Sequence, residues 1–398
     1  MTETFPPEIN GVAMTFGHLT RELGRRGHDI TVCRPRREGL NHHAHPEYSE
    51  MLVRGVPIPG YPLLQLGLPA GHALRRRWRA QRPDLVHVVT EGPLGASAVS
   101  AARALGLPVT SSFHTNFHAY THHYGFALLR WAAIGWLRHV HNRTERTFAP
   151  TEELCEELRG LGFERLHVLS RGVDVHHFSP DRRSAELRAA WGAGPEDPVV
   201  LHVGRMAPEK NYPLLFRAFA AMRAANPRVR LVLAGEGPLK EQLQHEHPEC
   251  IFAGFFSREE IGRYYASADL YIHASLTETF GNVLTEAMAS GLAVAGFNYA
   301  AARQFVRHDF NGLVVPCSAP DELIAAAISL VTDAPLRKRL RATARAALLD
   351  QSWENVVTRF ESDLLEVIAR AATAKKSIAL PANPASGLKS RAAPDLSR

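Results

Sequence analysis

TETFGNVLTEAMASG, residues 277 to 291, is the stretch on which the predicted fold of this chain depends. An apolar run from Asp269 to Ala274 precedes it and has the character of a buried parallel strand. Residues Asn282 to Ser290 are compatible with a helix, and Gly291 stands where a left-handed residue commonly ends one. The stretch therefore predicts a strand, a loop and a helix in that order.

Two carboxylates flank the start of this predicted helix. Glu278 lies in the loop and Glu286 inside the helix, in an E-x7-E arrangement. The backbone N–H groups from about Phe280 to Val283 have no partner within the helix, so they offer an anion site. From the residues alone, a cap-region carboxylate and a solvated helix residue remain an alternative. A sugar nucleotide would use both features, with its diphosphate on the amides and its hydroxyls on the carboxylates.

The segment from Glu278 to Gly291 closely resembles the E-x7-E signature of retaining GT-B glycosyltransferases of the family 4 type. The resemblance covers roughly residues 2 to 370 and is greatest with bacterial GDP-mannose-dependent α-mannosyltransferases and their lipid-glycosylating relatives. It implies an α/β fold of the GT-B class, with two Rossmann-like domains facing across a cleft. It also implies retention of anomeric configuration, with no cofactor and no metal.

The composition fits a packed soluble protein of about two domains. The chain has 398 residues, of which 45% are hydrophobic and 22% charged. No apolar run reaches about 18 residues, and the polar start from Thr2 to Asn10 does not resemble a signal peptide. We therefore expect a cytoplasmic location, either free or at the inner face of the cell membrane. Four scattered cysteines without metal-type spacing agree with a reducing compartment; they are Cys33, Cys155, Cys250 and Cys317.

The net charge of +6 indicates an acidic partner, either nucleotide phosphates or an anionic membrane surface. No nucleic-acid-binding motif is present. A helix predicted from Pro69 to Gln81 carries a cluster of arginines around a tryptophan, with leucines upstream. This cluster suits a membrane or acceptor side, with the tryptophan and the side-chain stems in anionic lipid, although a solvated basic face is an equal alternative. Its members are Arg75, Arg76, Arg77, Trp78 and Arg79.

The chain divides into a predicted acceptor-binding domain, residues 1–175, and a predicted donor-binding domain, residues 176–352. The segment from Thr2 to Val12 resembles the loop after a first Rossmann strand, but that strand itself is missing. A helix over residues 353–372 is predicted to pack back on the first domain, as in the resembled fold. Residues 373–398 are rich in Lys, Ala, Ser and Pro, and we predict that they are disordered.

The resemblance assigns two site residues to the first domain. Gly11 matches the glycine of a loop that closes on the donor diphosphate. His114 matches a histidine that contacts the transferred sugar, and it follows a strand predicted from Val109 to Ser112. Ligands of open α/β sheets bind outside such strand ends. A packed loop histidine would be the commoner explanation without the resemblance.

Several other histidines do not form a credible set of metal ligands. His42, His43 and His45 lie in a Pro- and charge-rich segment, and a ligand set needs converging geometry. His118 and His122 have zinc-like spacing but lack the glutamate of the corresponding motif. The sequence therefore predicts no metal site.

The second domain contains the Gly-Arg…Lys motif of the resembled family, in the loop after an apolar strand from Pro198 to Val203. Two cations on one loop suit a diphosphate leaving group, although surface salt bridges would explain them from the residues alone. The predicted catalytic residues are His114, Arg205, Lys210 and Glu278. The predicted donor-binding residues are Gly11, Gly204, Arg205, Lys210, Gly235, Phe256, Glu278, Phe280, Gly281, Asn282, Val283, Leu284 and Glu286.

These motifs predict a hexosyltransferase that uses a GDP- or UDP-hexose, with GDP-mannose preferred, and a lipid-linked or glycan acceptor. One alternative is a UDP-sugar-dependent diacylglycerol glycosyltransferase of the glucosyl or sulfoquinovosyl type. A GT-B enzyme of other chemistry, such as a phosphorylase or epimerase, is a second, but no motif for a cofactor-linked lysine is found. A nucleotide-sugar-binding protein without activity is a third, and it would be expected to have lost one of Glu278, Glu286, Arg205 or Lys210. All of these residues are present.

Overall fold

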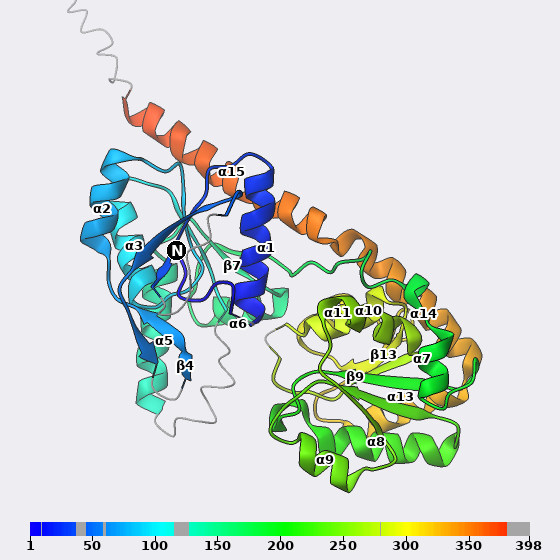
Figure 1. Ribbon diagram of the computed structural model, residues 1–398. Helices are drawn as coiled ribbons and strands as arrows, with labels where there is room; N and C mark the ends of the chain where they lie inside the picture. The colour runs from blue at the N-terminus through cyan, green and yellow to red at the C-terminus, as the bar shows by residue number, and fades with distance from the viewer. Residues whose placement is uncertain (9, 37–44, 59–60, 115–126, 279, 380–398) are drawn as a thin grey trace, which may run out of the picture.

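The computed structural model describes residues 1–8, 10–36, 45–58, 61–114, 127–278 and 280–379. Two α/β domains lie next to each other and are joined by a linker and by the long helix α15 (Figure 1). Each domain has parallel strands in its interior and helices outside, and most strands of the two larger sheets are buried on both faces.

The first domain combines parallel strands with one antiparallel hairpin. Strands β5 to β8 form a parallel sheet in that order, β1 pairs in parallel with β2, and β3 pairs in antiparallel fashion with β4. The elements of this domain are α1 (Gly11–Arg25), β1 (Thr31–Pro35), β2 (Ser49–Val53), β3 (Gly55–Ile58), β4 (Tyr61–Gly67), α2 (Gly71–Ala80), β5 (Val86–Val88), α3 (Pro93–Ala104), β6 (Val109–Ser112), α5 (Ala127–His141), β7 (Arg146–Ala149), α6 (Glu152–Gly160) and β8 (Leu166–Val168).

Met1 and Thr2 lie between β1 and β5, where the first strand of the domain was predicted to be missing. The amide of Thr2 donates to the carbonyl oxygen of Cys33 at 3.0 Å, and the amide of Val89 donates to that of Met1 at 2.8 Å. A cavity of about 400 Å³ continues along the same gap, between β1, β5 and the helices α1, α2 and α15. The described strands β1 and β2 therefore form a sheet separate from that of β5 to β8, with Met1 and Thr2 between the two.

The second domain contains a parallel sheet in the order β11-β10-β9-β12-β13-β14. The direction of strand addition reverses between β9 and β12, so the loops after these two strands meet at the carboxyl edge of the sheet. The elements are η1 (Pro180–Arg182), α7 (Ala185–Ala190), β9 (Val199–Val203), η2 (Pro208–Lys210), α8 (Tyr212–Ala225), β10 (Arg230–Ala234), α9 (Lys240–Glu246), β11 (Ile251–Gly254), α10 (Arg258–Ser267), β12 (Leu270–His273), α11 (Asn282–Ala289), β13 (Ala293–Phe297), α12 (Ala300–Phe305), β14 (Leu313–Val315), α13 (Pro320–Thr332), α14 (Ala334–Leu348) and η3 (Leu349–Gln351).

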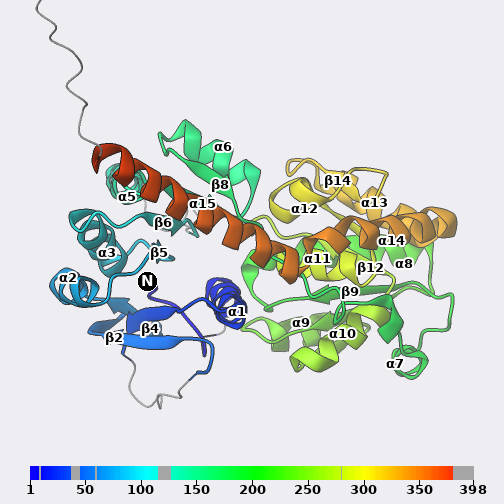
Figure 2. The same cartoon turned by 90° about the horizontal axis from the view of Figure 1, so that it is seen from above.

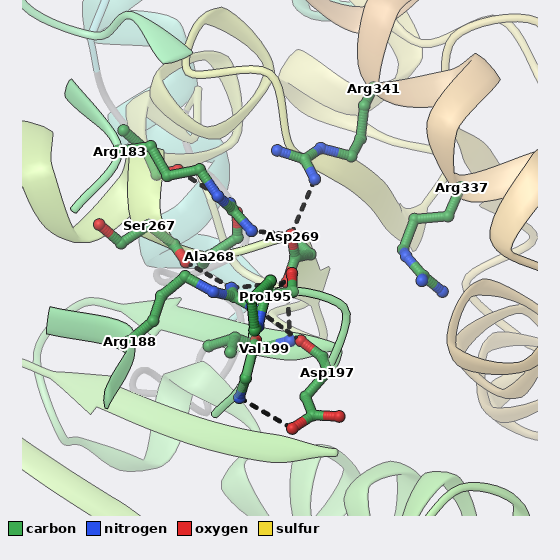
Figure 3. A network of polar contacts seen from close by, with 12 residues as sticks. Arg183, Arg188, Pro195, Asp197, Val199, Ser267, Ala268, Asp269, Arg337 and Arg341 are labelled. Atoms are coloured by element: carbon green, nitrogen blue, oxygen red, sulfur yellow. Dashed lines mark hydrogen bonds and ion pairs between the residues drawn. The ribbon is translucent and has the colours of Figure 1, made fainter. Parts of the chain in front are cut away.

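A buried carboxylate holds the opposite, amino-terminal edge of this sheet together (Figure 3). Asp269 accepts hydrogen bonds from Arg183 and Arg188 at 2.9 Å each, from Arg341 at 2.7 Å and from the amide of Val199 at 3.0 Å. These contacts attach η1, α7 and α14 to the starts of β9 and β12. The contacts of Asp269 do not involve the carboxyl-terminal edge of the sheet, where the loops carry the predicted site.

Helix α15 (Trp353–Ala379) leaves the second domain and lies along the first (Figures 1 and 2). Its Phe360 packs edge-on against Phe16 of α1 and Phe148 of β7. Its Glu361 pairs with Arg26 at 2.6 Å. These contacts confirm the predicted fold class, two Rossmann-like domains with a returning C-terminal helix. The prediction of disorder from residue 373 was wrong as far as Ala379, which is still helical, and residues 380–398 lie outside the described residues.

Candidate active site

The amino end of α11 has the properties of an anion site. Gly281 precedes the helix in the left-handed region with φ 93°, and no side chain caps the helix. The first backbone N–H groups of the helix, beginning with those of Asn282 and Val283, therefore have no partner within the helix. Phe280 and Leu284 are each 1% exposed and belong to the core. These predicted donor-binding residues can thus offer a ligand their backbone amides, whereas the two buried side chains hold the loop in place.

Glu278 and Lys210 come together beside this helix end. Nζ of Lys210 lies 2.5 Å from Oε1 of Glu278, and both side chains are largely buried. Burial acts to raise the pKa of Glu278, but the charge of Lys210, with a lesser contribution from His273 and from hydrogen bonds, outweighs it and holds that pKa below its ordinary value. The carboxylate is therefore ionised at neutral pH and can accept hydrogen bonds from hydroxyl groups.

Hydrogen bonds from side chains to backbone carbonyls join the two loops that carry this pair. Asn211, in the left-handed conformation, donates its side-chain amide to the carbonyl of Ala274 at 3.1 Å, and Ser275 donates to the carbonyl of Glu209 at 3.1 Å. Arg205, on the same loop as Lys210, is 68% exposed and pairs with Glu209 at 2.7 Å. The structure therefore brings Lys210 to Glu278, while Arg205 is directed to a neighbouring carboxylate.

Two predicted glycines allow close approach between these loops. Gly235 follows β10 with φ 147°, and a Cβ atom there would lie 2.0 Å from the carbonyl oxygen of Gly204. Gly204 itself has φ 155°. Phe256, another predicted donor-binding residue, is in the loop after β11 and packs against Tyr264 with ring centroids 3.9 Å apart. These residues line the carboxyl edge of β9, β10 and β11.

The second carboxylate of the motif lies on α11. The hydroxyl of Tyr265 donates to Oε2 of Glu286 at 2.9 Å. Tyr265 is fully buried, so the carboxylate is held against the core on one side. Glu278 and Glu286 therefore flank the uncapped helix end, as the spacing in the sequence predicts.

The first domain contributes His114 at the carboxyl end of β6. Its ring meets Phe16 edge-on with centroids 5.4 Å apart. Both ring nitrogens are buried, and within the described part of the chain neither has a hydrogen-bond partner. Burial lowers the pKa of His114 to about 3, with a further contribution from the charge of Arg171. The imidazole is therefore neutral at physiological pH.

Sequence reasoning missed two residues at this site. Arg171 reaches from the linker toward α11, and its Nη1 lies 3.5 Å from Oδ1 of Asn282. His273, at the end of β12, lies beneath the loop of Glu278 with its pKa lowered to about 4 by burial, an effect that the Glu278 charge opposes. Arg171 lies in none of the motifs from which the site was predicted, and His273 is hidden in the buried strand β12.

Comparison with known proteins decides the family. The family described as Glycosyltransferase Family 4 matches residues 9–177, and the family described as Glycosyl transferases group 1 matches residues 183–347. A "GDP-mannose-dependent alpha-mannosyltransferase" of Mycobacterium tuberculosis is 33% identical over 89% of this chain and 92% of its own length. A protein of the same description from Corynebacterium glutamicum is 31% identical over 93% of this chain and 88% of its own length. The chain belongs to the family 4, group 1 glycosyltransferases.

Solved structures of other glycosyltransferases share the fold of this one. Anabaena HepE in complex with UDP superposes with a TM-score of 0.70 at 19% identity, over 94% of this chain and 98% of that one. WaaG, a glycosyltransferase of lipopolysaccharide biosynthesis, superposes with a TM-score of 0.66 at 16% identity, over 92% and 98%. These neighbours support the GT-B architecture.

The arginine-rich helix of this glycosyltransferase differs from its prediction in one respect. Trp78 is 8% exposed and packs in the first-domain core with Leu74, so the prediction that it faces a membrane was wrong. Helix periodicity explains this, because positions 74 and 78 share one face. Arg76, Arg77 and Arg79 are exposed on the remaining surface, and Arg75 is half-buried. None of the described helices has the length and apolarity needed to cross a membrane.

The predicted absence of a metal stays a prediction. Among the described residues, no group of His, Cys, Asp or Glu is arranged to hold a metal ion. His42, His43, His118 and His122 lie outside those residues.

Proposed function

We propose that this glycosyltransferase is a retaining hexosyltransferase that moves mannose from GDP-mannose to a hydroxyl group of a lipid-linked or glycan acceptor. The observation that carries the proposal is the meeting of Lys210 and Glu278 beside the uncapped amino end of α11, at the strand-order reversal of the donor domain. The names of the mycobacterial and corynebacterial relatives support the choice of donor.

In this proposal the donor diphosphate binds at α11 and the hexose lies toward the first domain. The free amides of Asn282 and Val283 and the charge of Lys210 would stabilise the phosphate oxygens as negative charge develops there. When the donor binds, the Arg205 guanidinium would leave Glu209 and pair with the diphosphate instead. The carboxylates of Glu278 and Glu286 would accept hydrogen bonds from hydroxyls of the hexose and the ribose.

The proposed reaction is a front-face displacement. The bond between C1 of the hexose and the diphosphate oxygen breaks, and the acceptor oxygen forms its bond to C1 on the same face. The acceptor proton passes to an oxygen of the departing diphosphate, so no protein nucleophile is required. A neutral His114 would contact the sugar without adding charge. Because Arg205, Lys210 and the helix amides supply positive charge, no metal is required.

The test is nucleotide release by purified protein from GDP-mannose and UDP-glucose, with and without a lipid extract, followed by NMR of the product anomer. GDP release that depends on lipid and gives an α-linked product is expected. A β-linked product would contradict retention, and an absence of release from every donor would leave only a binding protein. Preferential UDP-glucose turnover would favour the diacylglycerol alternative, which is represented by more distant relatives at 26% and 27% identity.

A further inference from the structure

The two chain segments that connect the domains are held together at the linker. The amide of Val173 donates to the carbonyl of Gln351 at 2.9 Å, and the side-chain amide of Gln351 donates to the carbonyl of Arg171 at 3.2 Å. Gly172 packs closely against Trp353, and a Cβ atom added to Gly172 would lie 2.7 Å from the Cα atom of Trp353. The backbone of Arg171 is therefore fixed at the point where both segments pass between the domains.

The side chain of Arg171 leaves this linker and is buried between the two domains. It is 9% exposed, and its guanidinium lies 5.6 Å from the centre of the Phe280 ring. On the side of the first domain, a Cβ atom on Gly11 would lie 2.5 Å from its Nη1, so a larger residue there would displace the guanidinium. The charge is thus enclosed between the amino ends of α1 and α11.

Arg171 lacks the partners that other buried arginines of this protein have. A guanidinium has five N–H donors, and a buried charge is normally paired with an opposite charge. Arg188, which is 3% exposed, donates to Asp269 and to several backbone carbonyls (Figure 3). Within the described residues, Arg171 makes its hydrogen bond to Asn282 at the long distance of 3.5 Å and forms no ion pair with a carboxylate. The Arg171 guanidinium is therefore a buried charge that no carboxylate of the described residues pairs with directly.

The neighbouring cations differ from Arg171 because carboxylates already neutralise them. Lys210 is paired with Glu278, and Arg205 with Glu209. Burial lowers the pKa of Arg171 to about 10, with the Glu278 charge opposing the effect, so the side chain is a cation at neutral pH. A dianionic or trianionic group that entered between α1 and α11 would meet an unneutralised guanidinium and uncapped helix amides together.

We propose that Arg171 binds the donor diphosphate, at the phosphate nearer the sugar, and so connects nucleotide binding directly to the interdomain linker. This inference rests on the proposed function, because it takes a nucleoside diphosphate as the anion. The position of Arg171 beside Gly11 and toward His114 places it on the side of the first domain, where the sugar would lie. Nucleotide binding would thereby fix the relative orientation of the two domains.

The experiment is calorimetric titration of wild type, Arg171→Gln and Arg171→Lys with GDP and with GMP. Loss of one charged hydrogen-bonding group should weaken GDP binding by about 10- to 100-fold in Arg171→Gln. GMP lacks the phosphate nearer the sugar, so its affinity should change by less than about threefold. Arg171→Lys keeps the charge without the planar fork and should be intermediate. Small-angle scattering should show compaction on adding GDP to the wild type and none in Arg171→Gln.

The matched control is Arg345→Gln. Arg345 also contacts the linker and α11, but it donates to the carbonyls of Val175, Phe178 and Ala289. Its replacement should leave the ratio of GDP to GMP affinity unchanged.

Equal GDP affinity in wild type and Arg171→Gln, or equal weakening of GDP and GMP binding, would overturn the assignment of Arg171. Unchanged compaction in Arg171→Gln, or none in the wild type, would overturn the connection to the linker. If wild type bound neither GDP nor UDP, the proposed function itself would fail.

Discussion

Nζ of Lys210 lies 2.5 Å from Oε1 of Glu278, so an ammonium from the loop after β9 is held against a carboxylate from the loop after β12. The two side chains are 17% and 15% exposed, which reduces screening by solvent. A diphosphate that binds at α11 must share Lys210 with Glu278. The Lys210 ammonium would then contact both the diphosphate and Glu278, and so lie near the bond between the hexose and the diphosphate.

We expect Lys210→Ala and Arg205→Ala each to lower turnover by about 100-fold or more, because each would remove a charge that we propose stabilises the departing diphosphate. The effect should be larger for Lys210, whose loss also leaves Glu278 without its cation. Steady-state turnover of the purified variants measures this. Arg217→Ala, an exposed arginine of α8 paired with Asp321, is the charge-matched control and should retain wild-type turnover. Wild-type rates in both site variants would refute the role of the loop.

Chelators should leave activity intact, since Lys210, Arg205 and the amides of α11 can supply the positive charge that a metal would otherwise provide. The measurement is the initial rate in buffer with EDTA, and then after addition of Mg²⁺ or Mn²⁺. A rate lost in EDTA and restored by either metal would mean that these charges are insufficient.

The fold could be predicted from the sequence because its strands and helices follow local signals. The apolar strand before Thr277 and the helix after Gly281 both appear where periodicity and glycine placement predict them. The residues at the junction of the domains could not be found in that way. The partners of Arg171 come from positions 11, 280 and 282, and no local pattern reports such long-range proximity. Trp78 is a different case. The arginines around it in the sequence indicated a surface position, but Trp78 lies on the same helix face as Leu74 and is buried.

Stability should fall as the pH drops below about 6.5, because several buried histidines are held neutral in the folded protein. Burial lowers the pKa of His202 to about 3 from an ordinary value of 6.5. The unfolded chain therefore binds a proton between these values that the folded chain does not, and stability present above 6.5 is lost toward pH 3. His114 and His141 are shifted in the same direction.

Melting temperatures of wild type and His202→Phe at pH values from 4 to 7 measure this effect. His202 packs against Tyr212 and Tyr271, so an aromatic replacement keeps most of the contact. The variant should lose less melting temperature than the wild type over this range. His245→Gln, at an exposed position, should retain the wild-type slope. Parallel profiles for all three proteins would count against the burial argument.

Asp269→Asn should destabilise the second domain by about 3–5 kcal/mol, because it leaves buried guanidinium groups without their carboxylate. Arg188 is the most affected, since its side chain is 4% exposed. Urea denaturation measures the change in the free energy of unfolding. Asp321→Asn removes the partner of Arg217 in a pair that is 84% and 61% exposed, and it should change stability by about 0.5 kcal/mol or less. Similar values for the two variants would show that the network in Figure 3 contributes little.

We expect α2 to provide weak, salt-sensitive binding to anionic membranes, which would bring the protein to a lipid-linked acceptor. Each basic residue near an anionic surface contributes about 1 kcal/mol, so the four arginines of α2 would give roughly 4 kcal/mol, a millimolar attraction. Trp78 cannot add to this, because it is buried in the core.

The measurement is co-sedimentation with vesicles of graded anionic lipid content at low and high salt. The test variant changes Arg75, Arg76, Arg77 and Arg79 to Ser and should lose most binding. The control variant removes the same charge from the second domain by changing Arg217, Arg223, Arg228 and Arg339 to Ser. Equal sedimentation of the two variants would assign any attraction to net charge rather than to α2, and no sedimentation of wild type at low salt would leave α2 as a solvated basic face.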